Sequence, residues 1–277
     1  MTENLTSVLD FLPQLWEGIQ VTLILTLAGA LGAMIIALVL GLSMTSNHAW
    51  LRIPARIIVE FFRGTSLLVQ LFWLFYVLPL LGVELDPMSC GIGALALNYG
   101  AYSAEVVRSS ILTVARGQWE AAIALSLSPA RRMIRIIFPQ AWALMIPSLA
   151  TLLIQLLKGT AVVSFITLQD LTDKINQLRM STNDTFFSFT VGLIIYFVIA
   201  WILQESMNLL ERRATARLGR TRPNSRTERR LARRLARGEG GRHDAETAGT
   251  DPNGAGGPGS SGGPTGGPHG AGRGVSP

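Results

Sequence analysis

Gly117-Gln-Trp-Glu-Ala-Ala-Ile-Ala-Leu-Ser-Leu-Ser-Pro-Ala-Arg-Arg-Met-Ile-Arg-Ile-Ile-Phe-Pro-Gln-Ala-Trp142 is the stretch that decides the fold of this chain. Its first part is alanine-rich and favours a helix. A Ser-Leu-Ser run interrupts it, after which Ser128 is a natural N-cap and Pro129 suits the first position of a second helix. We expect that helix to end at Phe138, because Pro139 disfavours a helical conformation in the residue before it. The stretch is therefore predicted to be two short helices between apolar segments.

The order of these residues resembles the cytoplasmic coupling loop of ABC-importer permeases. That family has a Glu-Ala-Ala triplet, then a Gly, then an apolar-apolar-Pro run, which here correspond to Glu120-Ala121-Ala122, Ser126 and Ile137-Phe138-Pro139. Ser126 departs from the family, whose Gly permits a tight turn at positive φ. The resemblance implies a loop that docks on an ATPase through Gln118, Glu120, Ala121, Ala122, Leu125, Ser126, Arg131 and Pro139. An amphipathic helix at the membrane interface, without a partner, is the alternative.

The amino-acid composition predicts membrane spans rather than a soluble core. Hydrophobic residues make up 49% of its 277 residues, and the mean hydropathy is positive. The net charge of +6 is a property of the C-terminal tail: from residue 212 onward there are 13 Arg and 5 acidic residues, against 11 basic and 13 acidic residues before it. The single cysteine, Cys90, excludes an internal disulfide framework and suggests plain packing. The three histidines lack metal-ligand spacing, so no metal site is expected.

We predict an all-α integral membrane protein with about five transmembrane helices. The expected spans cover residues 18–43, 60–81, 88–104, 140–166 and 185–204, with loops at 45–56 and 167–184. Small residues along the first span suit close helix packing in lipid. The third span is weak because Asn98, Tyr99 and Tyr102 lie inside it.

The chain divides into three parts: an amphipathic lead-in at 1–16, a permease transmembrane domain at 17–211, and a tail at 212–277. The tail is basic and then rich in Gly and Pro, a composition typical of disorder. Basic residues cluster at 52–56, at 108–135 and in the tail. The positive-inside rule therefore predicts an N-terminus outside and a cytoplasmic C-terminus, with the coupling loop in the cytoplasm between spans 3 and 4.

The run Phe62-Arg63-Gly64-Thr65 before Leu67-Leu68-Val69-Gln70 resembles the polar amino-acid subgroup of these permeases, with Ser66 in place of its Pro. An opened turn at Gly64 and Thr65 that lines a cavity and a plain helix start both fit this run. The run Asn98 to Tyr102, followed by Glu105 and Arg108, is similar to the same subgroup. We expect Glu105 and Arg108 to pair on one helix face.

Lys158-Gly159-Thr160 stands where the subgroup often carries Lys-Asp-Thr or Lys-Asn-Thr. A lysine within an apolar span must face a cavity or reach the interface, and Gly159 leaves the backbone open to a ligand. The predicted substrate pathway comprises Gly64, Thr65, Lys158, Gly159 and Thr160. The runs 60–78 and 157–171 look most like permeases for ectoine and hydroxyectoine, which are zwitterionic cyclic amino-acid derivatives.

The resemblance implies an importer in a bacterial cell membrane. Its other parts would be a second permease chain, identical or different, a pair of cytoplasmic ATPase subunits and an extracytoplasmic solute-binding protein. This chain lacks a Gly-rich phosphate loop, so it is expected not to be an enzyme, and ATP and Mg would bind to the ATPase. The alternative is a secondary transporter or channel that acts without an ATPase, although no internal repeat is visible.

Overall fold

The computed structural model describes residues 2–217, and the side chains of residues 11–212 within that range. Regular structure in this part of the chain is entirely helical, which confirms the predicted all-α fold. The α-helices are α1 (Thr2–Met44), α2 (Ala49–Gly64), α3 (Leu67–Phe72), α4 (Pro87–Leu112), α5 (Arg116–Ala124), α6 (Pro129–Arg132), α7 (Phe138–Gly159), α8 (Leu171–Thr182) and α9 (Thr185–Arg217). Most of the predicted basic and Gly/Pro-rich tail lies outside the described residues.

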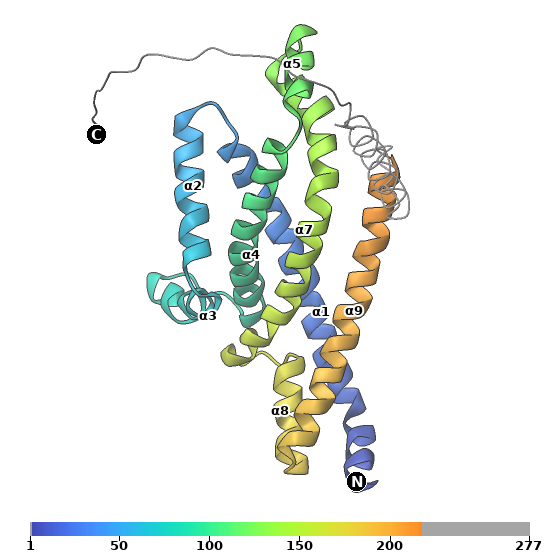
Figure 1. Cartoon of the computed structure of the whole chain (residues 1–277). Helices are drawn as coiled ribbons and strands as arrows, with labels where there is room; N and C mark the ends of the chain where they lie inside the picture. The colour runs from blue at the N-terminus through green and yellow to red at the C-terminus, as the bar shows by residue number, and fades with distance from the viewer. Residues whose placement is uncertain (1, 218–277) are drawn as a thin grey trace, which may run out of the picture. The chain divides into compact units, whose positions relative to one another are not determined.

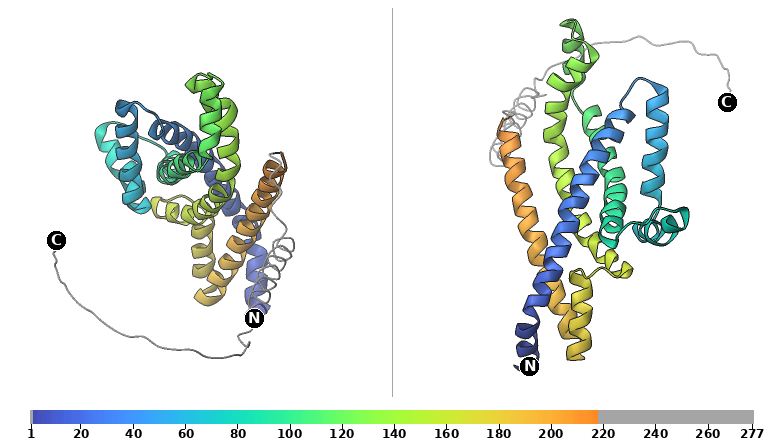
Figure 2. Two further views of the ribbon diagram at one scale, coloured as in Figure 1. Left: turned by 45° about the horizontal axis from the view of Figure 1, so that its top comes forward. Right: turned by 180° about the vertical axis from the view of Figure 1, so that it is seen from behind.

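The long helices run side by side between two ends of the bundle (Figure 1). The start of α1 and the short helix α8 lie at one end, whereas α5 and the last turns of α9 lie at the other. The view from behind shows the same arrangement, with α2 at the edge of the bundle farthest from α9 (Figure 2). The two ends of the described chain are thus opposite each other, as an odd number of crossings requires. Which end faces the cytoplasm stays a prediction.

Three helical segments are long and apolar enough to cross a membrane: Phe11–Met44, Pro129–Ile166 and Thr185–Arg212. A fourth is present if the bent pair Ala49–Gly64 and Leu67–Leu81 forms one span. The expected third span corresponds to α4, whose mean hydropathy is too low for it to be counted among these apolar segments. Its 26 residues nevertheless lie at the centre of the bundle, where buried Asn98, Ser103 and Ser110 face other helices. The count of five spans remains a prediction.

The small residues of α1 are used against α4 within this chain. A Cβ atom built on Gly32 would lie 2.8 Å from the Cβ of Ala96, and one on Gly41 would lie 2.7 Å from Val107. Gly100 of α4 is likewise closed off by Ile36, at 2.9 Å. In lipid, helices associate through such close packing rather than through exclusion of water. The stripe on α1 therefore fixes the internal pairing of α1 with α4 and is not free for a partner chain.

The second predicted span is broken, and it begins earlier than expected. Residues 49–56, predicted as loop, form the first half of α2. The helix ends at Gly64, and the continuation Leu67–Leu81 is turned by 103°. That continuation combines α3 with a π-helical turn at Trp73–Val77 and a 3-10 turn at Leu78–Leu81. The expected span at 60–81 is therefore interrupted where Thr65 and Ser66 both adopt extended backbone conformations.

Pro139 does not end a helix, contrary to expectation. Phe138 has the helical angles φ −60° and ψ −43°, and the chain runs from α6 into α7 through a π-helical turn at Met133–Ile137. In that turn the Phe138 N–H donates to the Met133 carbonyl, five residues back. The wider turn gives room for the proline ring, which would otherwise clash with a carbonyl of the preceding turn. The second short helix and the fourth span therefore form one uninterrupted helical segment, Pro129–Ile166.

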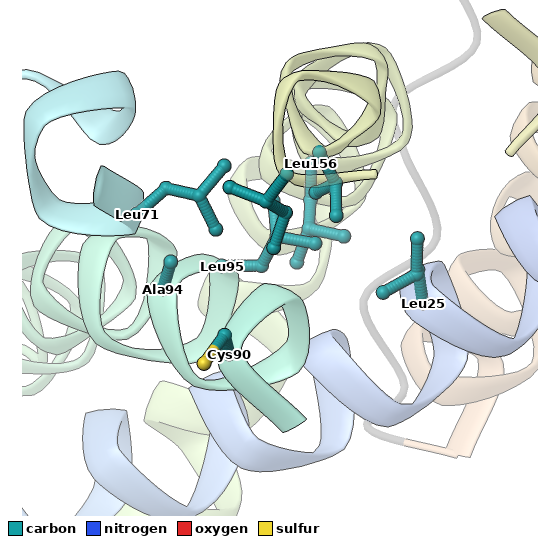
Figure 3. Packing of buried hydrophobic residues seen from close by; sticks show 8 residues of the cluster. Leu25, Leu71, Cys90, Ala94, Leu95 and Leu156 are labelled. Carbon is teal, nitrogen blue, oxygen red and sulfur yellow. The ribbon is translucent and has the colours of Figure 1, made fainter. Parts of the chain in front are cut away.

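A buried apolar cluster packs α1, α3, α4, α7 and the 3-10 turn Thr160–Ile166 against one another. Figure 3 shows Leu25 of α1, Leu71 of α3, Leu95 of α4 and Leu156 of α7 lining one region. Cys90 is fully buried in the same cluster, as the packing interpretation predicted. This cluster holds the bent second span against the rest of the molecule.

The predicted polar loop at 167–184 contains a helix, α8. Its N-cap is Asp170, whose Oδ1 accepts a hydrogen bond from the Asp173 N–H at 3.0 Å. Asn183 ends the helix in the left-handed conformation with φ 52°. The sequence contained the signal, because the buried Leu171, Ile175 and Leu178 recur at helical spacing.

Candidate functional site

The turn between α5 and α6 is a helix C-terminus closed by a residue at positive φ. Ser126 has φ 52°. Its N–H donates to the Ile123 carbonyl at 2.8 Å, and the Leu127 N–H donates to the Ala122 carbonyl at 3.2 Å. These two bonds are the pair that commonly closes a helix before a left-handed residue. Ser126 thus adopts the positive φ that the family's Gly permits, although Ser tolerates this conformation less well than Gly.

The short helices are fixed to the bundle rather than hanging from it. The Gln140 Nε2 donates to the Gln118 Oε1 at 3.1 Å, which ties α5 to the start of α7. The Arg132 guanidinium lies over the Trp119 ring, 6.0 Å from its centroid. Ile137 is fully buried in a cluster that also contains residues of α1, α4 and α7. These contacts join the two short helices to the start of α7.

The tip of this loop is apolar and exposed. Ile123, Leu125 and Ile134 have 58%, 71% and 69% of their surface exposed. All but one of the loop residues predicted to dock on an ATPase are exposed as well. The exposed ones are Gln118, Glu120, Ala121, Leu125, Ser126, Arg131 and Pro139. The exception is Ala122, of which only 1% is exposed because it packs inside the hairpin. Sequence reasoning missed Ile123 and Ile134, whose exposure depends on how the hairpin is folded.

The break after α2 is an opened turn whose carbonyls are capped by side chains. Four hydrogen bonds do this: Thr65 Oγ1 to the Phe61 carbonyl (3.0 Å), Gln70 Nε2 to Phe62 (2.9 Å), Asn98 Nδ2 to Phe62 (3.3 Å) and Tyr102 OH to Arg63 (3.1 Å). Freed backbone groups within a membrane need such partners. Of the two interpretations of Gly64 and Thr65, the opened turn is therefore the one found, and Gln70, Asn98 and Tyr102 complete it.

A cavity of about 380 Å³ lies beside this turn. Its lining is mainly aromatic and aliphatic, with two polar groups: Phe61, Phe62, Thr65, Val69, Gln70, Trp73, Leu74 and Leu97. The Gln70 Oε1 is buried and has no hydrogen-bond partner among the residues that the structure describes. Gln70 thus donates to the backbone through its nitrogen and leaves an acceptor oxygen unused next to the cavity. Thr65 lines this cavity, whereas Gly64 is exposed beside it.

The other three predicted pathway residues have different surroundings. Lys158 lines a separate groove of about 560 Å³ between α7 and α9, with Tyr196, Trp201 and other apolar residues, and forms no ion pair with any described residue. Gly159 is not open to a ligand, because a Cβ atom there would lie 2.5 Å from the Tyr99 hydroxyl oxygen. Thr160 is fully buried, and its hydroxyl donates to the Leu157 carbonyl at 2.7 Å. The five residues therefore do not share one cavity within this chain.

Charge pairing at α4 follows the prediction. Arg108 donates to both carboxylate oxygens of Glu105, at 2.9 and 2.5 Å. A two-bond arginine–carboxylate pair fixes geometry as well as charge. This pair lies on the helix that α1 and α2 pack against.

The described chain is a bundle of long helices with the short helices α5 and α6 at one end. Residues 33–216 match the family described as binding-protein-dependent transport system inner membrane component. The chain belongs to this family and is a multi-pass inner-membrane permease subunit.

Relatives and a solved structure agree with this assignment. The chain is 41% identical over 212 residues to a probable amino-acid ABC transporter permease of Sinorhizobium fredii, covering 74% of this chain and 89% of that protein. It is 36% identical over 205 residues to an L-cystine transport system permease of Bacillus subtilis, covering 74% and 88%. A crystal structure of an amino acid ABC transporter with histidines matches at 33% identity and a TM-score of 0.70, covering 75% of this chain and 97% of that one.

Proposed function

We propose that the chain is the permease subunit of an ATP-driven importer for polar amino acids or their derivatives. The α5–α6 loop would dock on a separate ATPase subunit, which binds ATP and Mg, and would pass its movement to α7. Two similar proteins carry names of amino-acid and cystine permeases, and a similar solved structure is titled as an amino acid transporter. An extracytoplasmic binding protein would deliver the solute.

The apolar tip of the loop is the observation that carries this proposal. Ile123, Leu125 and Ile134 are exposed apolar residues of this loop, and Glu120 and Arg131 are exposed charged residues of the same loop. Exposed apolar residues accompanied by charged ones are typical of protein interfaces. Because the π-helical turn makes α6 continuous with α7, closure of the ATPase pair would shift the balance between inward- and outward-facing states.

Replacing Leu125 by Glu tests the docking directly. Leu125 is exposed, so Leu125→Glu leaves the hairpin packing intact but places a charge in an apolar contact. We expect co-purification of the ATPase and stimulation of its activity to fall at least about tenfold. Ala122→Asp should also uncouple the two subunits, but through misfolding of the hairpin, since Ala122 is buried.

The matched control is Met180→Glu on α8, at the other end of the bundle, where Met180 is 73% exposed. This variant should retain ATPase binding and stimulation. Leu125→Glu with assembly and stimulation equal to wild type would rule out the docking proposal. ATP-independent uptake by the permease alone in proteoliposomes would favour the alternative of a secondary transporter or channel.

The substrate pathway is proposed to include the cavity beside Thr65 and the groove that contains Lys158. The unused Gln70 oxygen would accept a hydrogen bond from a substrate ammonium group, and Lys158 would attract a carboxylate. Gly159 and Thr160 would act indirectly, by seating Tyr99 and by holding the last turn of α7. A second permease chain would close the pathway.

Ectoine and hydroxyectoine are the narrower substrate proposal within the polar amino-acid class. Each combines a carboxylate with a delocalised cation, and aromatic faces such as that of Trp73 beside the cavity can hold such a cation. Retention of radiolabelled ectoine, cystine, glutamine and histidine by the cognate binding protein tests this. Retention of the three amino acids without ectoine would overturn the narrower proposal, and retention of only a sugar or metal ion would overturn both.

A further inference from the structure

The outward face of α2 carries two parallel rows of exposed side chains. One row is charged, Arg52, Arg56 and Glu60, and the other is apolar, Ile53, Ile57 and Phe61. These six residues line one open groove of about 640 Å³. The four-residue spacing places each row along one line of the helix surface. The groove is therefore basic at the start of α2 and apolar along its length.

The two arginines carry the uncompensated charge of this region. Glu60 is paired with Arg63 at 3.5 Å, and both oxygens of Glu105 are taken by Arg108. Arg52 and Arg56 form no ion pair with any described residue. Both also line a smaller polar cavity of about 210 Å³ between α2 and α4. The four arginines and two glutamates together leave two positive charges beside this cavity.

We propose that this face of α2 is a binding site for an anionic phospholipid. Arg52 and Arg56 hold the headgroup phosphate, and an acyl chain lies along Ile53 and Ile57, towards Phe61 at the edge of the cavity beside Thr65. The apolar row is 54%, 64% and 61% exposed, and Trp50 at the start of the helix is 71% exposed. Tryptophan at this position marks the boundary between headgroups and hydrocarbon. Trp50 and the two arginines thus lie in the first half of α2, and the apolar row continues beyond them to Phe61.

A second copy of this chain is a poorer occupant of the same face. In a two-fold symmetric contact, each surface meets its own copy. Four arginines would then come together, and burying them unpaired would be costly. A small free anion would neutralise the arginines but would leave the apolar row uncovered. A phospholipid satisfies both rows.

The test compares lipids on the detergent-purified transporter complex. Native mass spectrometry measures retention of phosphatidylglycerol and phosphatidylcholine, and thermal unfolding measures stabilisation by each. We expect phosphatidylglycerol to be retained about tenfold more strongly or better. Arg52→Gln/Arg56→Gln should lose about thirtyfold in phosphatidylglycerol affinity, since each basic residue contributes separately to anionic lipid binding. Arg52→Lys/Arg56→Lys should retain most of it.

The control is Arg212→Gln, which removes an exposed positive charge from α9. It should bind phosphatidylglycerol like wild type. Glycerol 1-phosphate, which lacks acyl chains, should neither stabilise the protein nor compete with the lipid at equal concentration. Equal retention of both lipids, full retention by the double Gln variant, or full competition by glycerol 1-phosphate would overturn the proposal.

A photo-crosslinker at position 57 tests the occupant without altering the arginines. It replaces Ile57, in the apolar row, and is activated in native membranes. An adduct with phospholipid is the expected product. A covalent permease dimer as the main product would show that a protein chain covers this face and would overturn the proposal.

Discussion

Ser126 shows how a single backbone conformation sets the coupling turn. Its φ of 52° lies in the left-handed region, where an L-residue with a Cβ atom is disfavoured by roughly 1–2 kcal/mol. The cost is accepted because the two closing hydrogen bonds from Ser126 and Leu127 need this geometry. Leu125, directly before this turn, is exposed at the tip of the loop.

Ser126→Gly is therefore expected to stabilise the protein. The gain from relieved strain is partly offset by about 0.4–1 kcal/mol of extra chain entropy in the unfolded state. The net increase in the free energy of unfolding should be on the order of 0.5–1 kcal/mol, seen as a higher Tm in detergent. Ser128→Gly is the control, because Ser128 has ordinary extended angles and Gly there should give no gain. A lower Tm for Ser126→Gly would contradict the strain argument.

Helix α8 is hydrogen-bonded to two other helices, α1 and α9, through its first turn. The Leu171 N–H donates to the Thr22 Oγ1 of α1 at 3.1 Å, and the Thr172 and Tyr196 hydroxyls of α8 and α9 lie 2.8 Å apart. Asp170, which caps this turn, has no exposed surface, and its Oδ2 has no hydrogen-bond partner within the described part of the chain. Burial raises the pKa of Asp170 to about 6, although hydrogen bonds from the start of α8 act in the opposite direction.

This raised pKa makes the junction more stable in acid. Between the ordinary pKa of 3.8 and about 6, the folded protein holds a proton on Asp170 that the unfolded chain releases. The contribution of this group to folding stability is thus complete below about pH 4 and is lost as the pH rises through 6. The loss should be about 1–3 kcal/mol.

Asp170→Asn tests this dependence, because the amide oxygen still caps α8 but carries no charge. The Tm of wild type at pH 7.5, relative to pH 5, should fall further than that of the variant, and the variant should be at least as stable at pH 7.5. Other carboxylates titrate equally in both proteins and cancel in the comparison. Identical pH profiles would show that Asp170 does not titrate in this range.

The groove between α7 and α9 places a lysine on an otherwise apolar surface of the bundle. Lys158 is exposed in the groove between α7 and α9, amid apolar side chains and without an ion-pair partner in the described residues. A lysine facing hydrocarbon at mid-span costs about 2.5–3.5 kcal/mol. A water-filled pathway shared with a second permease chain would remove that cost. The face of α2, at the other edge of the bundle, is instead suited to lipid.

Lys158→Met should separate these possibilities. If Lys158 faces the pathway, KM for uptake of a carboxylate-bearing substrate should rise about tenfold or more, as for a lost charged hydrogen bond. Assembly and ATPase activity should be unchanged, and Lys158→Arg should retain uptake. An unchanged KM together with a higher Tm would mean that the lysine only tolerates a lipid-facing position.

Several features followed from sequence patterns alone, because their physical causes are local. Long apolar runs specify membrane helices, and the Ser-Leu-Ser run at 126–128 specifies a break between two short helices. The i, i+3 spacing of Glu105 and Arg108 specifies their ion pair, and an isolated apolar cysteine specifies packing. Each of these depends only on neighbours along the chain.

Other features were decided by the tertiary structure, because they depend on residues far apart in sequence. The space beside Gly159 is occupied by the Tyr99 side chain from another helix. The carbonyls freed at the end of α2 accept hydrogen bonds from Asn98 and Tyr102. The small residues of α1 pack against α4, which no pattern within α1 could indicate. Pro139 is accommodated by a π-helical turn rather than by a helix end. The sequence by itself thus determined which segments are helical and where the loop lies, whereas side-chain packing between helices decided which surfaces stay open for a substrate, a lipid or a partner chain.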